Sequence, residues 1–368
     1  MMFDRRLLQN FDWILLLLLL LIAIVSVLNL YSATYPIGSE GGSRIFVKQI
    51  YWFLIGFAVL VMMTTFDYHH LETLAYPAYL VSVVLLLLVF FVGDVRSGSQ
   101  RWLSLGGISF QPSELLKITL VITLARFFNE HSQVNQYRLR DLWQPFLFIA
   151  LPCLLIAKEP DLGTALTIAI VCFSMILFAK VKWQSLLILF LVTLSAAPFV
   201  WTNLKEYQQK RVLTFLSPDM DPLGAGYHIN QSKIAIGSGL FGGKGYLKGT
   251  QTRLHFLPEQ HTDFAFSVLA EEWGFVGSSI LLLLYLLLML WGINIARNSR
   301  DRFGSLIALG IVAIIFWQLV INVSMTTGLL PVVGIPFIML SYGGSSIVST
   351  MAGMGLLMSI SMRRFMFQ

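Results

Sequence analysis

The chain has 368 residues, of which 57% are hydrophobic and only 12% are charged. Soluble domains carry about 25% charged residues, so this composition excludes an ordinary soluble protein and predicts a polytopic membrane protein. The formal net charge of +6 does not predict a nucleic-acid partner, because basic residues that flank membrane spans account for it. Cys153 and Cys172 both lie in apolar segments, and we expect free thiols there.

Ten apolar segments are candidates for membrane-spanning helices, since about 20 apolar residues cross the hydrocarbon core. We therefore predict an all-α integral membrane protein that forms one polytopic domain over residues 1–368. The first segment follows Arg5 and Arg6 as in a signal peptide, but nine further spans favour an uncleaved first helix. The predicted spans are 13–31, 46–66, 75–92, 113–129, 143–157, 163–179, 184–202, 265–295, 305–327 and 336–361.

The Lys and Arg residues near the span ends predict the orientation, because such residues gather on the cytoplasmic side. With ten spans both termini share a side, which holds twelve of these residues against five in the short loops opposite. We expect both termini to be cytoplasmic. The large loop 203–264, between spans seven and eight, then faces outward, and its aromatic residues and glycines predict short amphipathic helices and tight turns.

Span four opens with polar residues. Pro112 and Ser113 are typical of a helix start, and Glu114 and Lys117 are three apart, so they share a face and can pair. A purely structural ion pair explains them as well as catalysis does, although ionisable residues inside a span usually face a cavity. Arg101 precedes them closely, which suggests a common outward-facing polar pocket.

Three further segments carry weaker signals. Asp161 lies in a short outer turn and could cap span six. The run Gly237–Gly242 matches G-x-G-x-x-G but lacks the strand and helix of a dinucleotide site, so its glycines indicate tight turns or close packing. Two prolines and four glycines within 328–346 predict irregular backbone at membrane depth, which is tolerated only inside protein or beside a cavity.

The segment 255–272 closes the longest polar stretch and runs directly into span eight. Glu259, His261 and Asp263 should therefore lie at a membrane surface, at the mouth of the helix bundle. Catalytic or binding carboxylates are expected at such a place, partly shielded from water yet reachable. A solvated loop end with ordinary surface charges is the alternative. The histidine spacings match no zinc pattern.

Taken together, motifs over most of the chain resemble the SEDS (shape, elongation, division and sporulation) family. The resemblance is stronger to its elongation-type members than to its division-type members. The chain departs from the family pattern at Leu240, where a further glycine is common, and at Ala265, where a larger aliphatic residue is usual. The matching motifs are Gln100–Trp102, Phe110–Glu114, Glu159–Thr164, Asp221–His228, Gln231–Ser238, Gly249–Gln251, Leu257–Phe264, Thr327–Pro331 and Ser341–Ser345.

This resemblance implies a peptidoglycan glycosyltransferase that polymerises lipid II on the outer face of the bacterial cytoplasmic membrane during cell-wall elongation. It also implies a class B penicillin-binding protein, a transpeptidase, as partner. Asp263 falls on the essential catalytic aspartate of the family. The residues expected to contact substrate are Arg101, Glu114, Lys117, Asp161, Lys233, Glu259, His261, Thr262, Ser341 and Ser345.

Such a reaction requires a base for the incoming hydroxyl and positive charge near the leaving diphosphate. An α-linked sugar diphosphate that becomes a β-1,4 linkage needs one in-line displacement, in which a carboxylate accepts the proton of the incoming hydroxyl. Asp263 is the best candidate for that base. The leaving diphosphate needs nearby positive charge, from Arg101, Lys117 or a divalent cation such as Mg²⁺ or Mn²⁺ whose ligands the sequence does not identify. No organic cofactor is expected.

Four other functions stay open. A lipid II flippase would need alternating access, and the irregular backbone before span ten and the Glu114–Lys117 pair are in its favour. A solute or ion transporter should show stronger inverted repeats and more intramembrane charge. A non-catalytic scaffold would only recruit a partner, and a division-type polymerase would share the same chemistry. The outward placement of the polar motifs favours a polymerase.

Overall fold

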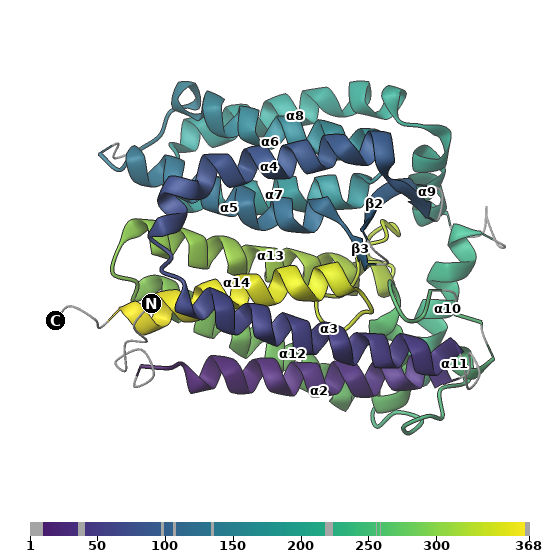
Figure 1. The fold of residues 1–368 in the computed structure, drawn as a ribbon. Helices are drawn as coiled ribbons and strands as arrows, with labels where there is room; N and C mark the ends of the chain where they lie inside the picture. Colours follow the sequence, from purple (N-terminus) through teal and green to yellow (C-terminus); the bar gives the residue numbers. More distant parts are fainter. Residues whose placement is uncertain are drawn as a thin grey trace.

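The computed structural model describes residues 10–35, 41–96, 99–105, 108–133, 136–217, 224–254, 256–257 and 259–364 (Figure 1). Ten long helices in this part of the chain run side by side and occupy the ten predicted positions. They are α2 (Trp13–Thr34), α3 (Gly41–Thr65), α4 (His70–Val92), α5 (Pro112–Glu130), α6 (Trp143–Lys158), α7 (Leu162–Phe178), α8 (Trp183–Asn203), α12 (Ala265–Arg297), α13 (Arg302–Thr326) and α14 (Gly344–Arg363).

Seven of these helices are long and apolar enough to cross a membrane within the described residues. The other three are α5, α7 and α8. Helix α5 contains four charged residues, Glu114, Lys117, Arg126 and Glu130, and the apolar described parts of α7 and α8 are shorter. The prediction of an all-α, multi-pass membrane protein is confirmed.

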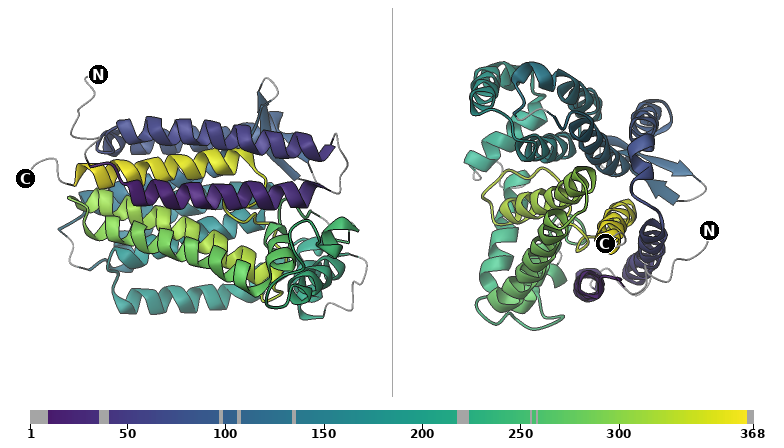
Figure 2. Two further views of the ribbon diagram at one scale, coloured as in Figure 1. Left: turned by 90° about the horizontal axis from the view of Figure 1, so that it is seen from below. Right: turned by 90° about the vertical axis from the view of Figure 1, so that its left-hand side faces the viewer.

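The bundle has two halves that meet along α13 and α14. In Figure 1, α4 to α8 form the upper half and α2, α3, α12, α13 and α14 the lower half. Helix α13 packs against α5 and α7, and α14 packs against α3 and α5. The described chain begins and ends at one end of the bundle (Figures 1 and 2), as an even number of crossings requires.

The opposite end of the bundle carries a small sheet that the sequence did not predict. Strands β1 (Asp94–Arg96), β2 (Ser99–Leu105) and β3 (Ile108–Phe110) pair antiparallel in the order β1-β2-β3. Strand β2 holds Arg101, and β3 leads through Gln111 into α5, where Pro112 occupies the first helical turn. The sheet therefore fixes Arg101 relative to the start of α5.

The last span is shorter than predicted. Helix α14 begins at Gly344 rather than at residue 336, and the preceding residues 327–343 have no regular structure. Gly328 and Gly334 adopt φ values of +73°, and Met339 adopts +61°. An α-helix cannot contain residues with such angles. The irregular backbone predicted from the prolines and glycines is confirmed, and it displaces the start of the helix.

Within its described residues the large loop 203–264 consists of short helices and turns, as predicted. They are α9 (Glu206–Leu216), α10 (Ala225–Ser238) and α11 (Thr250–Arg253). Residues 218–223, 255 and 258 of the loop lie outside the described part. Ser232 fastens α10 to the bundle: its hydroxyl lies 2.7 Å from that of Ser267 in α12 and donates to the Thr326 carbonyl at 2.6 Å.

The orientation of the bundle can be tested with reporters, because the basic residues predict which end is cytoplasmic. A reporter fused at the end of the chain should be active in the cytoplasm, and one inserted after Ser217 should be active outside. Alkaline phosphatase and green fluorescent protein fusions at both positions measure this. The reverse pattern would place the end with the sheet and α9 to α11 in the cytoplasm.

Candidate active site

Asp263 lies on a tight turn that immediately precedes α12. Glu259 begins the turn with φ of +47°. Its carbonyl accepts from the Thr262 N–H at 3.1 Å and from the Phe264 N–H at 3.4 Å. The Thr262 hydroxyl donates to the Glu259 carboxylate at 3.1 Å. The turn is thus closed by its own hydrogen bonds, and it presents Asp263 and Glu259 from one short segment.

The irregular segment before α14 holds this turn in place. The Ser341 hydroxyl donates to the Thr262 carbonyl and accepts from the Phe337 N–H at 2.9 Å. The Tyr342 N–H donates to the His261 carbonyl at 2.8 Å. Ser341 is almost fully buried. In this structure its hydroxyl positions the turn by binding the backbone of the turn.

Helix α13 adds a second support through Asn322, which is fully buried. Its amide nitrogen donates to the Asp263 carbonyl at 2.9 Å and to the Ile335 carbonyl at 2.7 Å. One side chain therefore links α13, the turn and the irregular segment. A Cβ placed on Gly334 would lie 3.5 Å from the Asp263 carboxylate, an ordinary contact distance, so the irregular segment passes directly beside that carboxylate. Gly334 has φ of +73°, which other residues rarely adopt.

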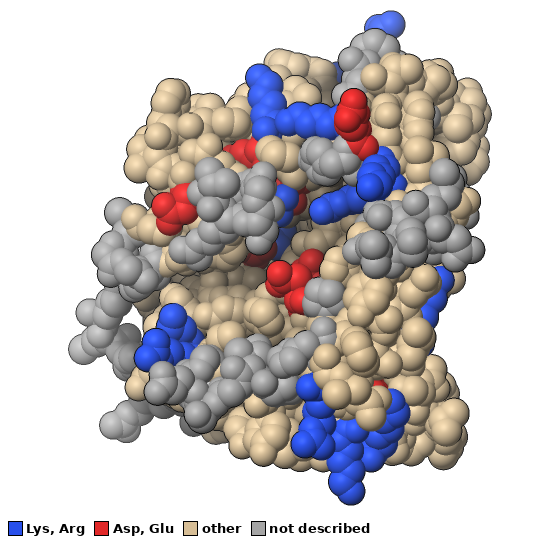
Figure 3. Space-filling view, turned by 90° about the vertical axis from the view of Figure 1, so that its right-hand side faces the viewer, with Lys and Arg blue, Asp and Glu red and all other residues tan. Residues whose placement is uncertain are grey.

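A cavity of about 80 Å³ is lined by two arginines, Arg101 and Arg211, and by Val333, the residue before Gly334. Arg101 comes from β2, and Arg211 comes from α9. Pro160 and Pro331 line the same cavity. Figure 3 shows acidic and basic side chains gathered around a hollow at this end of the molecule. Two guanidinium groups in one cavity suit a phosphate or diphosphate group.

The charges around Asp263 act on its carboxyl group. Burial, with a smaller effect from the negative charge of Glu259, raises its pKa, Arg211 and Arg101 act in the opposite direction, and the resulting pKa is about 6. The side chain is nevertheless partly exposed to solvent. A partly exposed carboxylate that is ionised near neutral pH can serve as a general base.

Arg101 is fixed by the short turn between α6 and α7. Its guanidinium donates to the Pro160 carbonyl at 2.9 Å and forms an ion pair with Asp161 at 3.4 Å. Asp161 also caps α7, accepting from the Thr164 N–H at 3.1 Å, as predicted. Burial, with a smaller effect from Asp161, raises the pKa of Glu159 to about 8, so Glu159 is largely protonated at pH 7 and adds little negative charge here.

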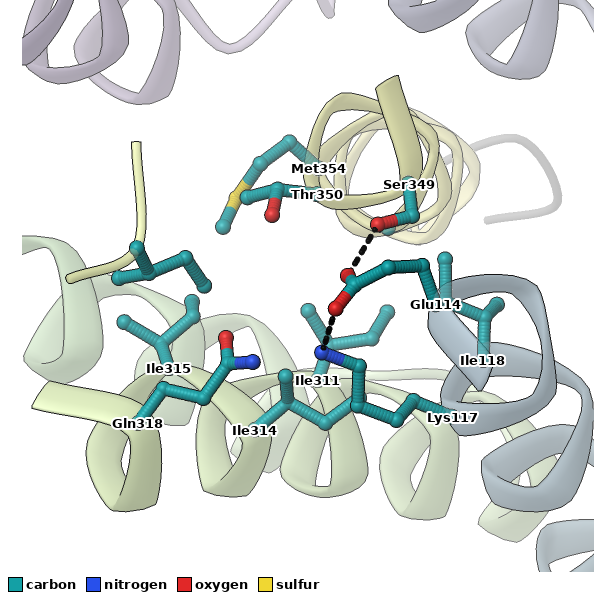
Figure 4. Close-up of a pocket in the computed structure, with 12 residues that line it drawn as sticks. Glu114, Lys117, Ile118, Ile311, Ile314, Ile315, Gln318, Ser349, Thr350 and Met354 are labelled. Carbon is teal, nitrogen blue, oxygen red and sulfur yellow. Dashed lines mark hydrogen bonds and ion pairs between the residues drawn. The ribbon is translucent and has the colours of Figure 1, made fainter. Parts of the chain in front are cut away.

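The predicted pair Glu114–Lys117 lies deeper, where α5, α13 and α14 meet. The two side chains are 2.7 Å apart, and the Ser349 hydroxyl donates to Glu114 at 3.0 Å. Gln318 points into the same cavity, of about 20 Å³ (Figure 4). Its carbonyl oxygen has no hydrogen-bond partner among the described residues. A cavity of this size and polarity fits a water molecule.

A family model for cell cycle proteins of the FtsW, RodA and SpoVE type matches residues 10–365. The chain belongs to the FtsW/RodA/SpoVE family. The peptidoglycan glycosyltransferase MrdB of Escherichia coli K12 is 40% identical over 97% of this chain and 95% of its own length. The peptidoglycan glycosyltransferase RodA of Treponema pallidum is 34% identical over 97% and 98%.

Solved structures of FtsW/RodA/SpoVE proteins share the fold. A chain from a peptidoglycan synthase complex, described as coordinating polymerization and crosslinking, is 32% identical with a TM-score of 0.82, over 96% of this chain and 98% of that chain. A crystal structure of the rod shape determining protein RodA of Thermus thermophilus is 29% identical with a TM-score of 0.72, over the same shares of the two chains.

The structure of this FtsW/RodA/SpoVE protein brings some predicted residues together and separates others. One turn holds Glu259, His261, Thr262 and Asp263, and Ser341 supports it. Arg101 and Asp161 form an ion pair with each other. Their roles toward substrate stay predictions, as do those of the remaining residues.

Besides the Glu114–Lys117 pair, two more predicted residues lie outside this group. The Ser345 hydroxyl accepts from the Gln111 N–H at 3.1 Å and thereby joins α14 to the start of α5. Lys233 on α10 lies over Gly328, where an added Cβ would come within 2.0 Å of its side chain. Ser345 therefore has a structural partner, and Lys233 approaches the irregular segment from the loop side.

The sequence analysis missed Arg211 and Asn322. Arg211 belongs to an amphipathic helix of the large loop, and no motif distinguishes it from the other basic residues there. Asn322 carried a usable signal, because it and Gln318 are the two amide side chains of a largely apolar span. Polar side chains at such positions normally serve a buried hydrogen bond.

Proposed function

We propose that this chain, a peptidoglycan glycosyltransferase, polymerises lipid II at the cavity beside Asp263 during cell-wall elongation. The observation that carries the proposal is a partly exposed carboxylate with raised pKa on which Arg101 and Arg211, the two arginines that line one cavity, act electrostatically. Base and cations thus lie within electrostatic range of each other, which a single inverting displacement requires. The similarity to glycosyltransferases over nearly the whole chain supports the same reaction.

In the proposed mechanism, the hydroxyl oxygen of one sugar attacks the anomeric carbon of the other from the face opposite the diphosphate. Asp263 takes the hydroxyl proton as the new C–O bond forms. The bond from the anomeric carbon to the diphosphate oxygen breaks at the same time, and the diphosphate leaves on its polyprenyl chain. Arg101 and Arg211 would stabilise the negative charge that develops on the leaving group.

A divalent cation stays part of the proposal. Within the described residues, no group of three or more His, Cys, Asp or Glu side chains could hold a metal ion by itself. Mg²⁺, however, is commonly bound by one or two carboxylates together with substrate phosphates and water. Asp263 and Glu259, which influence each other electrostatically, are the residues that would hold it. When bound, it would neutralise diphosphate charge.

We also propose a class B penicillin-binding protein as the partner, and a location in the bacterial cytoplasmic membrane with both termini inside and the site outward. A structurally similar chain belongs to a complex that coordinates polymerization and crosslinking, and this supports a crosslinking partner here. The basic residues at the end that carries both termini support the orientation.

Purified protein in liposomes should convert lipid II into glycan polymer without a partner enzyme, and its pH profile tests the base. Asp263 accepts a proton only when ionised, and its pKa is raised to about 6. We therefore expect kcat/KM to fall as the pH drops below about 6 and to level off above pH 7. Transport of lipid II across the liposome membrane without polymer would support a flippase instead. If kcat/KM instead fell only near pH 4, the raised pKa of Asp263 as the base would be contradicted.

Asn322→Leu should lower kcat more than it raises KM, because it removes the two hydrogen bonds that hold Asp263 and the irregular segment. A looser turn admits water, so the pKa of Asp263 should fall and the acid limb should move to lower pH. Gln318→Leu is the matched control, since it deletes a buried amide one turn away that does not touch the Asp263 turn. An unshifted acid limb in Asn322→Leu would show a role in folding alone.

A further inference from the structure

Helix α12 is interrupted at Gly274, which has φ of +64° and ψ of −158°. The interruption removes main-chain hydrogen bonds on both sides, and the loop 239–245 replaces them. Its N–H groups donate to two carbonyls before the break, and its carbonyls accept from two N–H groups after it. The four bonds are Lys244 N to Glu271 O at 3.0 Å, Gly245 N to Glu272 O at 3.0 Å, Phe275 N to Leu240 O at 2.9 Å and Val276 N to Phe241 O at 3.1 Å.

Side-chain contacts make this attachment rigid. The fully buried carboxylate of Glu271 accepts from Lys244 Nζ at 2.6 Å, from the Thr250 N–H at 2.8 Å and from the Gln251 N–H at 3.1 Å. A Cβ on Gly239 would lie 2.0 Å from a carbonyl oxygen of α12, and one on Gly243 would lie 2.1 Å from another. Only glycine permits an approach this close.

The attached loop carries an exposed apolar tip. Leu240 is 79% exposed, Phe241 is 72% exposed, and Phe241 stacks on Phe275, which is 63% exposed. Leu240 has φ of +49°, a left-handed conformation that is strained for a residue other than glycine. The large side chain is thus kept at a strained position where the described protein offers it little packing.

The position of the tip along α12 suggests what covers it. The part of the helix after the break runs from Val276 to Arg297 and has 22 residues. At 1.5 Å per residue it is about 33 Å long, which is close to the thickness of a hydrocarbon core. Exposed apolar side chains, among them Ile280 and Leu283, continue down this part from the tip. Trp273 and Tyr246, whose rings lie 6.2 Å apart, flank the break as aromatic residues do at a membrane interface.

We propose that Leu240 and Phe241 are inserted into the lipid leaflet at this end of the bundle, and that the break at Gly274 marks the membrane surface. The occupant of the apolar face is lipid, because the face continues without interruption into the apolar surface of a membrane-spanning helix. Burial of the Leu240 side chain in lipid would stabilise the loop and offset the strain at this residue. The loop would then set the height at which α12 and the turn before it stand above the lipid.

The proposal is independent of the catalytic assignment and can be tested by spin-label accessibility in liposomes. Phe241→Cys, labelled with a nitroxide, is compared with Ile280→Cys on the apolar surface of α12 and with Arg253→Cys on the exposed side of α11. The unmutated chain measures background labelling of Cys153 and Cys172. We expect the label at 241 to be relaxed by oxygen and protected from a water-soluble nickel chelate, as at 280 and in contrast to 253.

Relaxation of the 241 label by nickel, as at 253, would show that the tip stands in water and would overturn the proposal. Protection from both reagents would show that protein covers the tip, such as a second copy of the chain, and would overturn it too. Leu240→Cys gives a second reading of the same tip if Phe241→Cys does not fold. Cysteine at 240 or 241 changes only an exposed side chain, so the four main-chain hydrogen bonds between the loop and α12 stay in place.

Discussion

Asp263→Asn should reduce glycan polymerisation by about 10²–10⁴-fold, the usual effect of losing a positioned base. The asparagine keeps the size and shape of the side chain, and the hydrogen bond from Asn322 reaches the main-chain carbonyl, which the substitution leaves unchanged. The variant should therefore fold, insert into the membrane and still bind lipid II. Single-turnover polymerisation of fluorescent lipid II, with binding measured separately, checks both parts.

The matched control is Asp141→Asn, the same chemical change at an exposed residue in the turn between α5 and α6. It should retain full activity. Polymer near the normal level from Asp263→Asn would rule out the general-base role. Loss of lipid II binding together with turnover would identify Asp263 as a ligand of substrate or metal instead.

Lys117→Met should destabilise the protein by about 3–5 kcal/mol, because it leaves the buried Glu114 carboxylate without its cation. Glu114 is 7% exposed and Lys117 is 4% exposed, so little solvent screens the pair. Of the contacts described for Glu114, the 3.0 Å hydrogen bond from Ser349 would remain. Thermal unfolding in detergent, followed by circular dichroism, measures the effect.

Arg126→Gln provides the comparison, since it breaks an ion pair on the same helix, with Glu130, whose side chains are 23% and 37% exposed. Exposed pairs of this kind are worth about 0.3–0.5 kcal/mol. Arg126 also donates to the Thr73 carbonyl at 3.3 Å and lies over the Tyr76 ring, so the loss should be larger than that of the pair alone but well below that of Lys117→Met. Exchange of the charges, Glu114→Lys with Lys117→Glu, should recover part of the stability lost in either single variant. Normal stability of both single variants without polymerisation would instead show that the pair acts on substrate.

Apolar segments could be located from the sequence because a membrane span leaves a long, local signal. All ten helices lie where the apolar runs indicated them. The strands β1 to β3 were missed because β1 and β3 have only three residues each and all three strands lie within a polar loop. The start of α14 was misplaced because residues 336–343 are apolar, although Met339 there adopts φ of +61°.

Some residues of the candidate site could be identified from the sequence, and others could not. Asp263 and Glu259 could be singled out because a polar loop ends beside them and a span begins. Arg211 could not, because its relation to Arg101 arises only when α9 folds back over β2 and the turn before α7. The partners of the Asp263 turn, Asn322 and Ser341, lie far away in the sequence, and a local pattern carries no information about such contacts.

The support of the Asp263 turn has a consequence for the synthesis of the protein. Asn322 follows Asp263 by 59 residues, and Ser341 follows Thr262 by 79. At roughly 5–20 residues per second, the ribosome completes the second of these partners about 4–16 s after it has made the turn. A chain released before α13 would carry the base into the membrane without Asn322 or Ser341, and therefore without the hydrogen bonds that they supply. Translation therefore makes the turn first, and its support is complete only once the irregular segment before α14 has been made.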